Sequence, residues 1–173
     1  MTKLLIILFF ILINIGCTKD VVTDFNSAVN YSSYKTYEFA TFSTTQATTL
    51  DGKRIEDAIA TQLYTKGLNG VNDNADLLVR HSIVEQSDFQ TYGTSFGFGY
   101  RHRSVGVAYS TPTQIREYRY GKIIVELIDT ETNSVVWRST SQRRLTETMT
   151  PSSRKTFIDT QINEMFKEYP PQK

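Results

Sequence analysis

Few side chains in this sequence could act as nucleophiles or as general acids and bases. The chain has two histidines, His81 and His102, and a single cysteine, Cys17. Nucleophilic catalysis needs an activated side chain with a base within reach, and neither histidine lies near a sequence that identifies a catalytic serine. His81 falls in a predicted strand in line with apolar residues, which favours a partly buried core histidine. We therefore expect no catalytic residues and no enzyme.

Patterns that bind metals or cofactors are also missing from the sequence. Two histidines, without a second cysteine or a His-Glu-x-x-His spacing, do not make a zinc site. The segment 72–76 (Asn-Asp-Asn-Ala-Asp) lacks the spacing and terminal glutamate of a calcium loop, which favours a plain turn. The segment 96–99 (Phe-Gly-Phe-Gly) lacks the lysine of a P-loop and the third glycine of a dinucleotide-binding loop. We expect neither a metal nor a cofactor.

Residues 92–109 are rich in glycine and aromatic residues and form the best candidate for a contact surface. Glycine lets the backbone approach a partner closely, and aromatic rings give a large contact area at small entropic cost. An exposed hairpin of this composition suits docking to a protein, a glycan or a membrane surface. The alternative is a bulged hairpin whose rings lie on the domain's own sheet. The candidate contact residues are Tyr92, Phe96, Phe98, Tyr100, Arg101, His102, Arg103 and Tyr109.

The net charge argues against nucleic acid as a partner. Of the 173 residues, 19 are Lys or Arg and 18 are Asp or Glu, so the formal net charge is +1. A nucleic-acid-binding domain would carry a strong basic excess, and we expect no such partner. The apolar content of 39% and the low proline count of 4 indicate one folded globular domain.

The N-terminus has the pattern of a lipoprotein signal peptide. Lys3 precedes an unbroken apolar run over residues 4–13, which is too short for a membrane-spanning helix. Gly16 directly before Cys17 resembles the lipobox of bacterial lipoproteins, although Asn14 replaces the usual leucine. Acylation of Cys17 would hold the protein on a membrane, because each buried methylene contributes about 0.8 kcal/mol. The alternative is an ordinary cysteine after a conventional signal peptide.

These features predict a signal peptide (1–16), a lipid anchor with a short tether (17–30) and a single domain (31–170). Thr18 occupies the position where an aspartate would retain a lipoprotein in the inner membrane of a Gram-negative bacterium. We therefore expect the chain on the outer membrane, facing the periplasm. Residues 18–20 faintly resemble a surface-export tag, which leaves surface display as a minor alternative.

The apolar patterns of the remaining chain predict an α+β fold. One helix follows a cap at Asp51 and ends at Gly67, and a second begins at Thr150-Pro151. A two-layer sandwich buries the apolar stripes of both helices against one face of a mixed, mostly antiparallel sheet of about four to six strands. The expected strands cover residues 31–40, 77–84, 119–128 and 134–145, with a loop at 42–50 and a polar link at 111–116.

The sheet face away from the helices is a second, weaker candidate surface. Ile124 and Ile128 lie on it, together with charged residues of the same strand. With Val136, they either meet a partner or a second copy of the chain, or belong to an ordinary mixed face.

Three blocks of sequence have the order and spacing of one known family. They are Asp24-Phe25 with the Tyr-Lys-Thr-Tyr of 34–37, the segment from Arg54-Ile55 through Lys66-Gly67 to the Ala-Asp-Leu-Leu-Val of 75–79, and the hairpin from 120–122 to the Val-Val-Trp-Arg of 135–138. Across residues 22–170 they resemble the bacterial lipoprotein family catalogued as domain of unknown function 4136. The resemblance implies an envelope lipoprotein with a small α+β domain, and it brings no catalytic residues.

Two functional hypotheses follow. The first is a non-enzymatic structural or interaction module, bound to the membrane through acylated Cys17 and to an unknown envelope protein. The alternative is a periplasm-facing module that binds a small ligand, a lipid, a glycan or a peptide, through residues 92–109.

Overall fold

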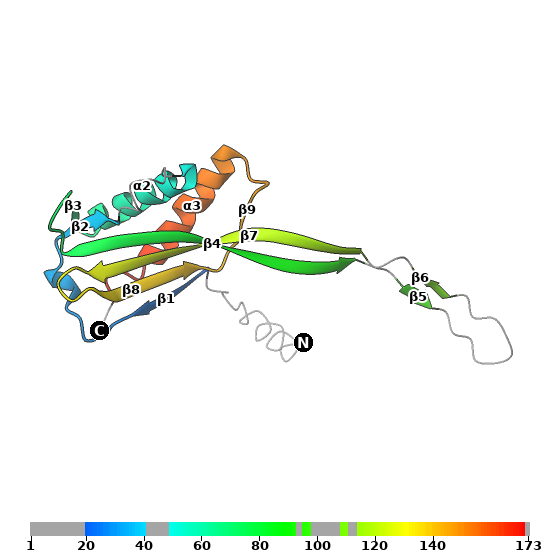
Figure 1. The fold of residues 1–173 in the computed structure, drawn as a ribbon, viewed down its shortest axis with the longest axis horizontal. Coiled ribbons are helices and arrows are strands. Elements are labelled where there is room, and N and C mark those ends of the chain that lie inside the picture. Colours follow the sequence, from blue (N-terminus) through cyan, green and yellow to red (C-terminus); the bar gives the residue numbers. More distant parts are fainter. Residues whose placement is uncertain (1–19, 41–48, 93–94, 98–107, 111–113, 172–173) are drawn as a thin grey trace, which may run out of the picture.

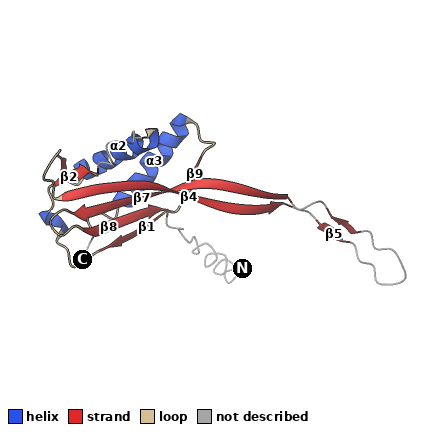
Figure 2. Cartoon of the chain, in the orientation of Figure 1, coloured by secondary structure: helices blue, strands red, loops and turns tan. Residues whose placement is uncertain are grey.

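The protein is described by a computed structural model over residues 20–40, 49–92, 95–97, 108–110 and 114–171. Its strands are β1 (Val21–Phe25), β2 (Thr36–Phe39), β3 (Asn69–Gly70), β4 (Leu77–Tyr92), β5 (Ser95–Gly97), β6 (Ala108–Ser110), β7 (Gln114–Asp129), β8 (Ser134–Ser141) and β9 (Leu145–Thr146). Seven of them form one sheet in the order β1-β8-β7-β4-β2-β3, with β9 paired to β7. Two helices, α2 (Leu50–Thr65) and α3 (Pro151–Phe166), cover one face of this sheet (Figure 1, Figure 2).

The predicted α+β class is confirmed, but the sheet has more strands than the four to six expected. Two of the seven strands, β3 and β9, have only two residues each. β1 lies within the segment 17–30, which was expected to be a tether. Its five residues pair antiparallel with the outer edge of β8. The sheet therefore begins ten residues before the expected domain boundary at residue 31.

The sheet is mixed, as predicted. β2 pairs in parallel with β4, and α2 connects these two strands in sequence. Among the described strands of this sheet, the pairs formed by β1, β8, β7, β9 and β4 with one another are antiparallel. The expected strand 31–40 is shorter than predicted, because Tyr31–Ser33 forms a 3-10 turn ahead of β2.

The hydrophobic core lies between the helices and the sheet. Its fully buried side chains include Ile55, Ile59 and Leu63 of α2, Ile158, Ile162 and Met165 of α3, and Ile123, Val125 and Leu127 of β7. The four-residue spacing in α2 and the two-residue spacing in β7 are those of a helix stripe and a strand face. Ile124 and Glu126 alternate with the buried residues of β7 and point to the other face, which neither helix covers.

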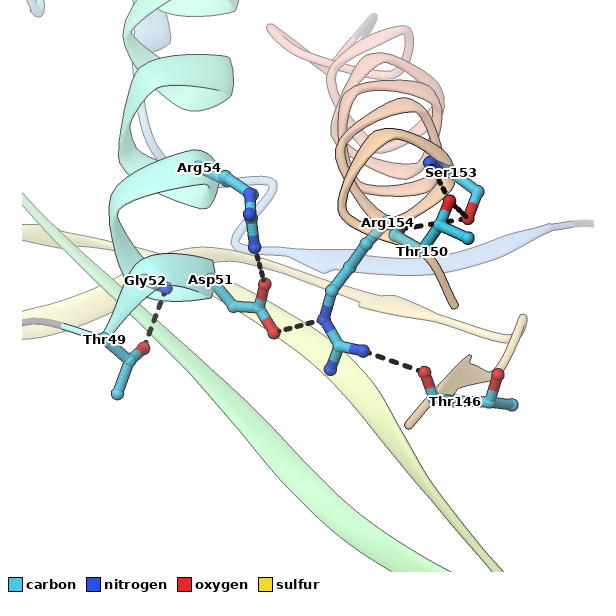
Figure 3. Close-up of polar contacts among 8 residues, drawn as sticks. All are labelled: Thr49, Asp51, Gly52, Arg54, Thr146, Thr150, Ser153 and Arg154. Atoms are coloured by element: carbon cyan, nitrogen blue, oxygen red, sulfur yellow. Dashed lines mark hydrogen bonds and ion pairs between the residues drawn. The ribbon is translucent and has the colours of Figure 1, made fainter. Parts of the chain in front are cut away.

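The two helices begin next to each other, and an ion pair between Asp51 and Arg154 joins their first turns (Figure 3). The N-cap of α2 is Thr49, whose hydroxyl accepts a hydrogen bond from the N–H of Gly52 at 2.9 Å. Asp51, the expected cap, lies inside the helix instead. Its carboxylate accepts hydrogen bonds from Arg54 Nη1 and Arg154 Nε, both at 2.6 Å. The carboxylate therefore links α2 to α3.

The ends of the other elements follow the sequence more closely. Thr150 caps α3 and Pro151 is its first residue, as predicted. Gly67 has φ +85°, the left-handed conformation expected after α2. The expected strand 134–145 is divided, because β8 ends at Ser141 and β9 follows. Within the described residues, neither helix has the length and apolar character that crossing a membrane requires.

Candidate functional site, an extended β arm

Strands β4 and β7 have 16 residues each and extend well beyond the rest of the sheet (Figure 1). We call the arm the paired segments 85–92 and 114–121, in which Glu85 lies opposite Gly121 and Tyr92 opposite Gln114. β8 pairs with β7 only as far as Ile124, and β2 reaches β4 only near its first residues. We call the junction of the arm with the sheet its root, where β9 pairs with Tyr120 and Gly121. Apart from β9, the described part of the chain provides no neighbouring strand for the arm.

Gly121 sets the geometry at the root of the arm. A Cβ atom at this position would lie 2.5 Å from Cγ2 of Ile83, which is closer than real side chains approach. On the other side, Gly121 pairs with Leu145 of β9, a buried residue. A glycine within a strand often marks such a close approach. Any larger residue would displace Ile83 from the edge of the core.

A second set of contacts at the root involves Arg144, in the turn before β9. Its guanidinium lies 4.5 Å from the centroid of the Tyr120 ring and forms an ion pair with Asp88 at 2.5 Å. The Tyr120 hydroxyl donates a hydrogen bond to Oε1 of Gln86 at 3.3 Å. Tyr120 and Gln86 lie opposite each other in the arm. Arg144 thus holds the body of the domain to both strands of the arm.

The root is also joined to the helical layer. Arg154 of α3, which pairs with Asp51 of α2, donates through Nη1 to the carbonyl of Thr146 at 2.8 Å (Figure 3). Thr146 belongs to β9 and lies opposite Tyr120 of the arm. A continuous set of polar contacts therefore runs from both helix N-termini to the root. The direction of the arm is fixed by the body.

Beyond the root, the arm presents large apolar side chains to solvent. Phe89 is 68% exposed and Ile115 is 67% exposed, and the two lie on the same face of the ribbon. On the opposite face, the hydroxyls of Tyr92 and Tyr118 are 3.0 Å apart. This contact raises the pKa of Tyr92 and lowers that of Tyr118. The arm thus exposes aromatic and aliphatic groups on both of its faces.

Three of the predicted contact residues belong to the described part of the chain, at the end of the arm and in the β5–β6 pair. Tyr92 is the last residue of β4 and is exposed. Phe96 and Tyr109 lie opposite each other in the β5–β6 pair, whose backbone alone is described. The predicted residues outside the described part of the chain are Phe98, Tyr100, Arg101, His102 and Arg103, together with Cys17. The hairpin arrangement is found, while the exposure of the other rings stays a prediction.

Sequence patterns missed most of the arm. The expected strands ended at Val84 and began at Arg119, whereas residues 85–92 and 114–118 are strand. The expected polar link 111–116 includes Gln114, the first residue of β7. Both faces of the arm meet solvent, so its residues need not alternate between apolar and polar as they would over a core. The sequence features that could have indicated a strand here were the β-branched and aromatic residues Ile115, Tyr118 and Tyr120.

The described residues first considered for acid–base or metal chemistry make contacts that belong to the fold of the domain. His81 is buried beneath α2, as predicted, with Nε2 3.4 Å from Oε1 of Glu56. Asp76 accepts hydrogen bonds from the N–H groups of Lys35 at 2.7 Å and Thr36 at 2.9 Å. The turn that contains Asp76 therefore holds the start of β2 in place through these two hydrogen bonds. No group of three or more potential ligands is found among the described residues.

A shallow depression of about 390 Å³ lies at the other end of the sheet from the arm. Its lining includes Phe25 at the end of β1, Tyr169 after α3, and the two lysines Lys66 and Lys167. The ligand-binding hypothesis predicted a cavity beside residues 92–109, and this depression is remote from them.

The chain belongs to the family defined by a domain of unknown function (DUF4136), whose sequence profile matches residues 21–171. The resemblance inferred from the three sequence blocks is thereby confirmed. No curated protein gives a significant sequence match.

Several solved structures resemble this chain at low sequence identity, and one of them has a TM-score above 0.5. A PDZ domain protein from Parabacteroides distasonis is 18% identical with a TM-score of 0.60, and the match covers 89% of this chain but 36% of that one. A PelC dodecamer from Paraburkholderia phytofirmans is 17% identical with a TM-score of 0.43, over 84% of this chain and 95% of that one. A minor lipoprotein from Acinetobacter baumannii is 12% identical with a TM-score of 0.35, over 79% and 92%. This chain thus spans about a third of the first protein, and that likeness concerns the fold alone.

Proposed function

We propose that this protein is a lipid-anchored, non-enzymatic lipoprotein of the cell envelope that binds another envelope component through its arm. The observation that carries the proposal is the arm itself, a ribbon that leaves the sheet and exposes Phe89 and Ile115. The anchor is acylated Cys17 after a signal peptide of residues 1–16, on the periplasmic side of the outer membrane. The absence of enzymatic activity is inferred from the scarcity of nucleophiles and bases in the sequence.

Physical chemistry favours a partner for the arm. A two-stranded ribbon without a covering layer is only marginally stable in water. Free strand edges and adjacent exposed apolar side chains are also sites where proteins aggregate unless another chain covers them. The contacts of Gly121 and Arg144 nevertheless hold the arm in one direction. A fixed, partly apolar ribbon suits binding by strand addition or by burial of Phe89 and Ile115.

Photo-cross-linking in the native envelope tests this function. A cross-linking amino acid at Thr91, on the arm, should capture one envelope protein reproducibly. The double variant Phe89→Ser/Ile115→Ser should reduce this capture at least about tenfold, the loss expected from about 1.4 kcal/mol of contact energy. Tyr64→Ser removes an aromatic residue that is 74% exposed on α2 and serves as the matched control.

The outcomes separate the two hypotheses. Capture that survives the double variant, or that is lost equally in the control, would overturn the arm as the contact element. Capture of a lipid or a glycan in place of a protein would favour the small-ligand alternative. Cys17→Ala should release a folded protein from the membrane, and full function of the released form would contradict the need for an anchor.

A further inference from the structure

The sheet face away from the helices carries a row of four charges across four adjacent strands. Asp24 of β1 lies opposite Arg138 of β8, and Arg138 lies opposite Glu126 of β7. Glu126 in turn lies opposite Arg80 of β4. Because directly opposed residues in a sheet share a face, all four side chains belong to one transverse row. Read from β1 to β4, its signs are negative, positive, negative, positive.

Contacts within the chain keep this row in place. Nε of Arg80 lies 2.7 Å from Oε2 of Glu126, and Nη1 of Arg138 lies 3.5 Å from Oε1 of the same carboxylate. The Glu126 side chain is only 13% exposed, whereas Arg80 and Arg138 are 49% and 51% exposed. Both guanidinium groups therefore still have donors available to a molecule that covers this face.

An alternating row of four charges is complementary to its own reverse. If a second copy faces the first across a two-fold axis parallel to the strands, the row meets itself in the opposite order. Asp24 then faces Arg80 of the other copy, and Arg138 faces Glu126. We infer that this face binds a second copy of the chain and forms a symmetric dimer. A different protein would have to supply the complementary row independently.

Apolar residues on both sides of the charge row support a contact of this kind. Toward the arm, Val22, 55% exposed, shares a row with Thr140 and Ile124. Toward the other end, Val135, 44% exposed, lies opposite the buried Ile128. In the dimer Val135 packs against Ile128 of the other copy, Ile124 packs against Thr140, and the charges between these two rows fix the register. Electrostatic complementarity of this type contributes more to specificity than to affinity.

The size of the face suggests a dimer that dissociates readily. Four strands about 4.8 Å apart and eight residues about 3.3 Å apart give a flat area of roughly 500 Å² per chain. Stable protein interfaces bury about 800 Å² per partner, so this contact is at the small end of the range. The same two-fold axis places both β1 starts at one end of the dimer. Both chains could then be anchored in one membrane, which raises their effective concentration.

Two charge reversals test the pairing. Two differently tagged copies of the full-length chain, expressed together in the native envelope, should co-purify. Asp24→Lys should reduce capture of itself about tenfold or more, because the introduced lysine would face Arg80 twice across the axis. Arg80→Glu should fail in the same way, because the introduced glutamate would face Asp24. Asp57→Lys, a reversal on the exposed side of α2, should leave capture unchanged.

The decisive sample combines the two variants. A chain with Asp24→Lys and a chain with Arg80→Glu should capture each other. The introduced lysine then faces the introduced glutamate at one end of the row, and the unchanged Arg80 faces the unchanged Asp24 at the other end. Sedimentation of the purified wild-type protein in detergent should give two copies per complex. Failure of wild-type chains to capture each other, or of the mixed variants to recover capture, would overturn the dimer. Capture of a different protein by this face without self-capture would do the same.

Discussion

At the scale of single residues, the most unusual side chain is Gln161 of α3. It is fully buried, and neither its amide nitrogen nor its amide oxygen has a hydrogen-bond partner in the described structure. Unsatisfied buried polar groups reduce stability, because they lose their hydrogen bonds to water on folding. The helical stripe of Ile158, Ile162 and Met165 surrounds this position in sequence, so an apolar residue would fit the pattern.

We predict that Gln161→Met stabilises the protein. Methionine keeps the length and approximate volume of glutamine and removes both unpaired atoms, so the free energy of unfolding should rise by about 1–2 kcal/mol. Urea denaturation of the two proteins measures this difference. Asn163→Met, at an exposed position of the same helix, should change the free energy by less than about 0.5 kcal/mol. Destabilisation by Gln161→Met would mean that the amide has a function in the folded state.

Two carboxylates should make stability depend on acid pH. The N–H groups of Lys35 and Thr36 lower the pKa of Asp76 below its ordinary value. The Tyr34 hydroxyl, 2.7 Å away, and the N–H of Thr132 lower the pKa of Asp129. Both groups therefore contribute stability that is complete above about pH 4, the unfolded pKa of an aspartate, and is lost as the pH falls through the lower folded values.

The measurement is the free energy of unfolding between about pH 6 and pH 2.5, a range that spans the aspartate pKa values. We expect it to decline below about pH 4 in the wild type, as these carboxylates become protonated. The decline should be smaller in the double variant Asp76→Asn/Asp129→Asn, whose amides do not titrate in this range. Equal slopes in the two proteins would contradict a role for these carboxylates in acid stability.

At the scale of elements, the parts that cover the core could be predicted from sequence. The stripes Ile55–Ile59–Leu63 and Ile158–Ile162 must face an apolar layer, so they identify both helices. β1 escaped prediction because, of its five residues, only Val21 is buried, and five edge residues give little periodicity. Thr49 was missed as a cap because Asp51 is as good a capping residue by type. The glycine- and aromatic-rich segment 92–109 contains the paired strands β5 and β6, and its role as a contact surface stays a prediction, whereas the arm that precedes it was not expected.

The close contact of Gly121 with Ile83 at the root of the arm can be tested by substitution. Gly121→Ala should lower the free energy of unfolding by about 1–3 kcal/mol, because the new methyl group would overlap Cγ2 of Ile83. The double variant Ile83→Ala/Gly121→Ala removes that atom. The cost of the alanine at position 121 should therefore shrink to less than about 1 kcal/mol in the Ile83→Ala background. An unchanged cost in both backgrounds would show that the backbone of Gly121, and not its contact with Ile83, matters.

At the scale of the whole molecule, β1, the described strand nearest in sequence to the proposed anchor Cys17, begins at the end of the sheet from which the arm extends. Val21 at the start of β1 lies opposite Ser141 at the end of β8, close to the place where the arm leaves the body (Figure 1). Three residues lie between Cys17 and Val21, so the four Cα–Cα steps that join them span at most about 14 Å. The eight residues 85–92 extend the arm by about 26 Å. An arm pointing away from an anchored membrane would place the rest of the sheet inside the bilayer.

The arm of the lipidated protein should therefore be directed toward the membrane surface. A nitroxide label attached at Thr91→Cys on the arm should be accessible to oxygen dissolved in the lipid, whereas a label at Asn133→Cys, in the hairpin at the opposite end of the sheet, should not. Cys17 is the single cysteine of the sequence, so each introduced cysteine is the only free thiol in protein that carries the proposed acylation. If both labels report water alone, then either residues 17–20 do not form a short tether or Cys17 does not carry the anchor. Mass spectrometry of the N-terminal peptide distinguishes these two cases. If only the label at residue 91 contacts lipid, the partner of the arm must be sought among molecules at the membrane surface.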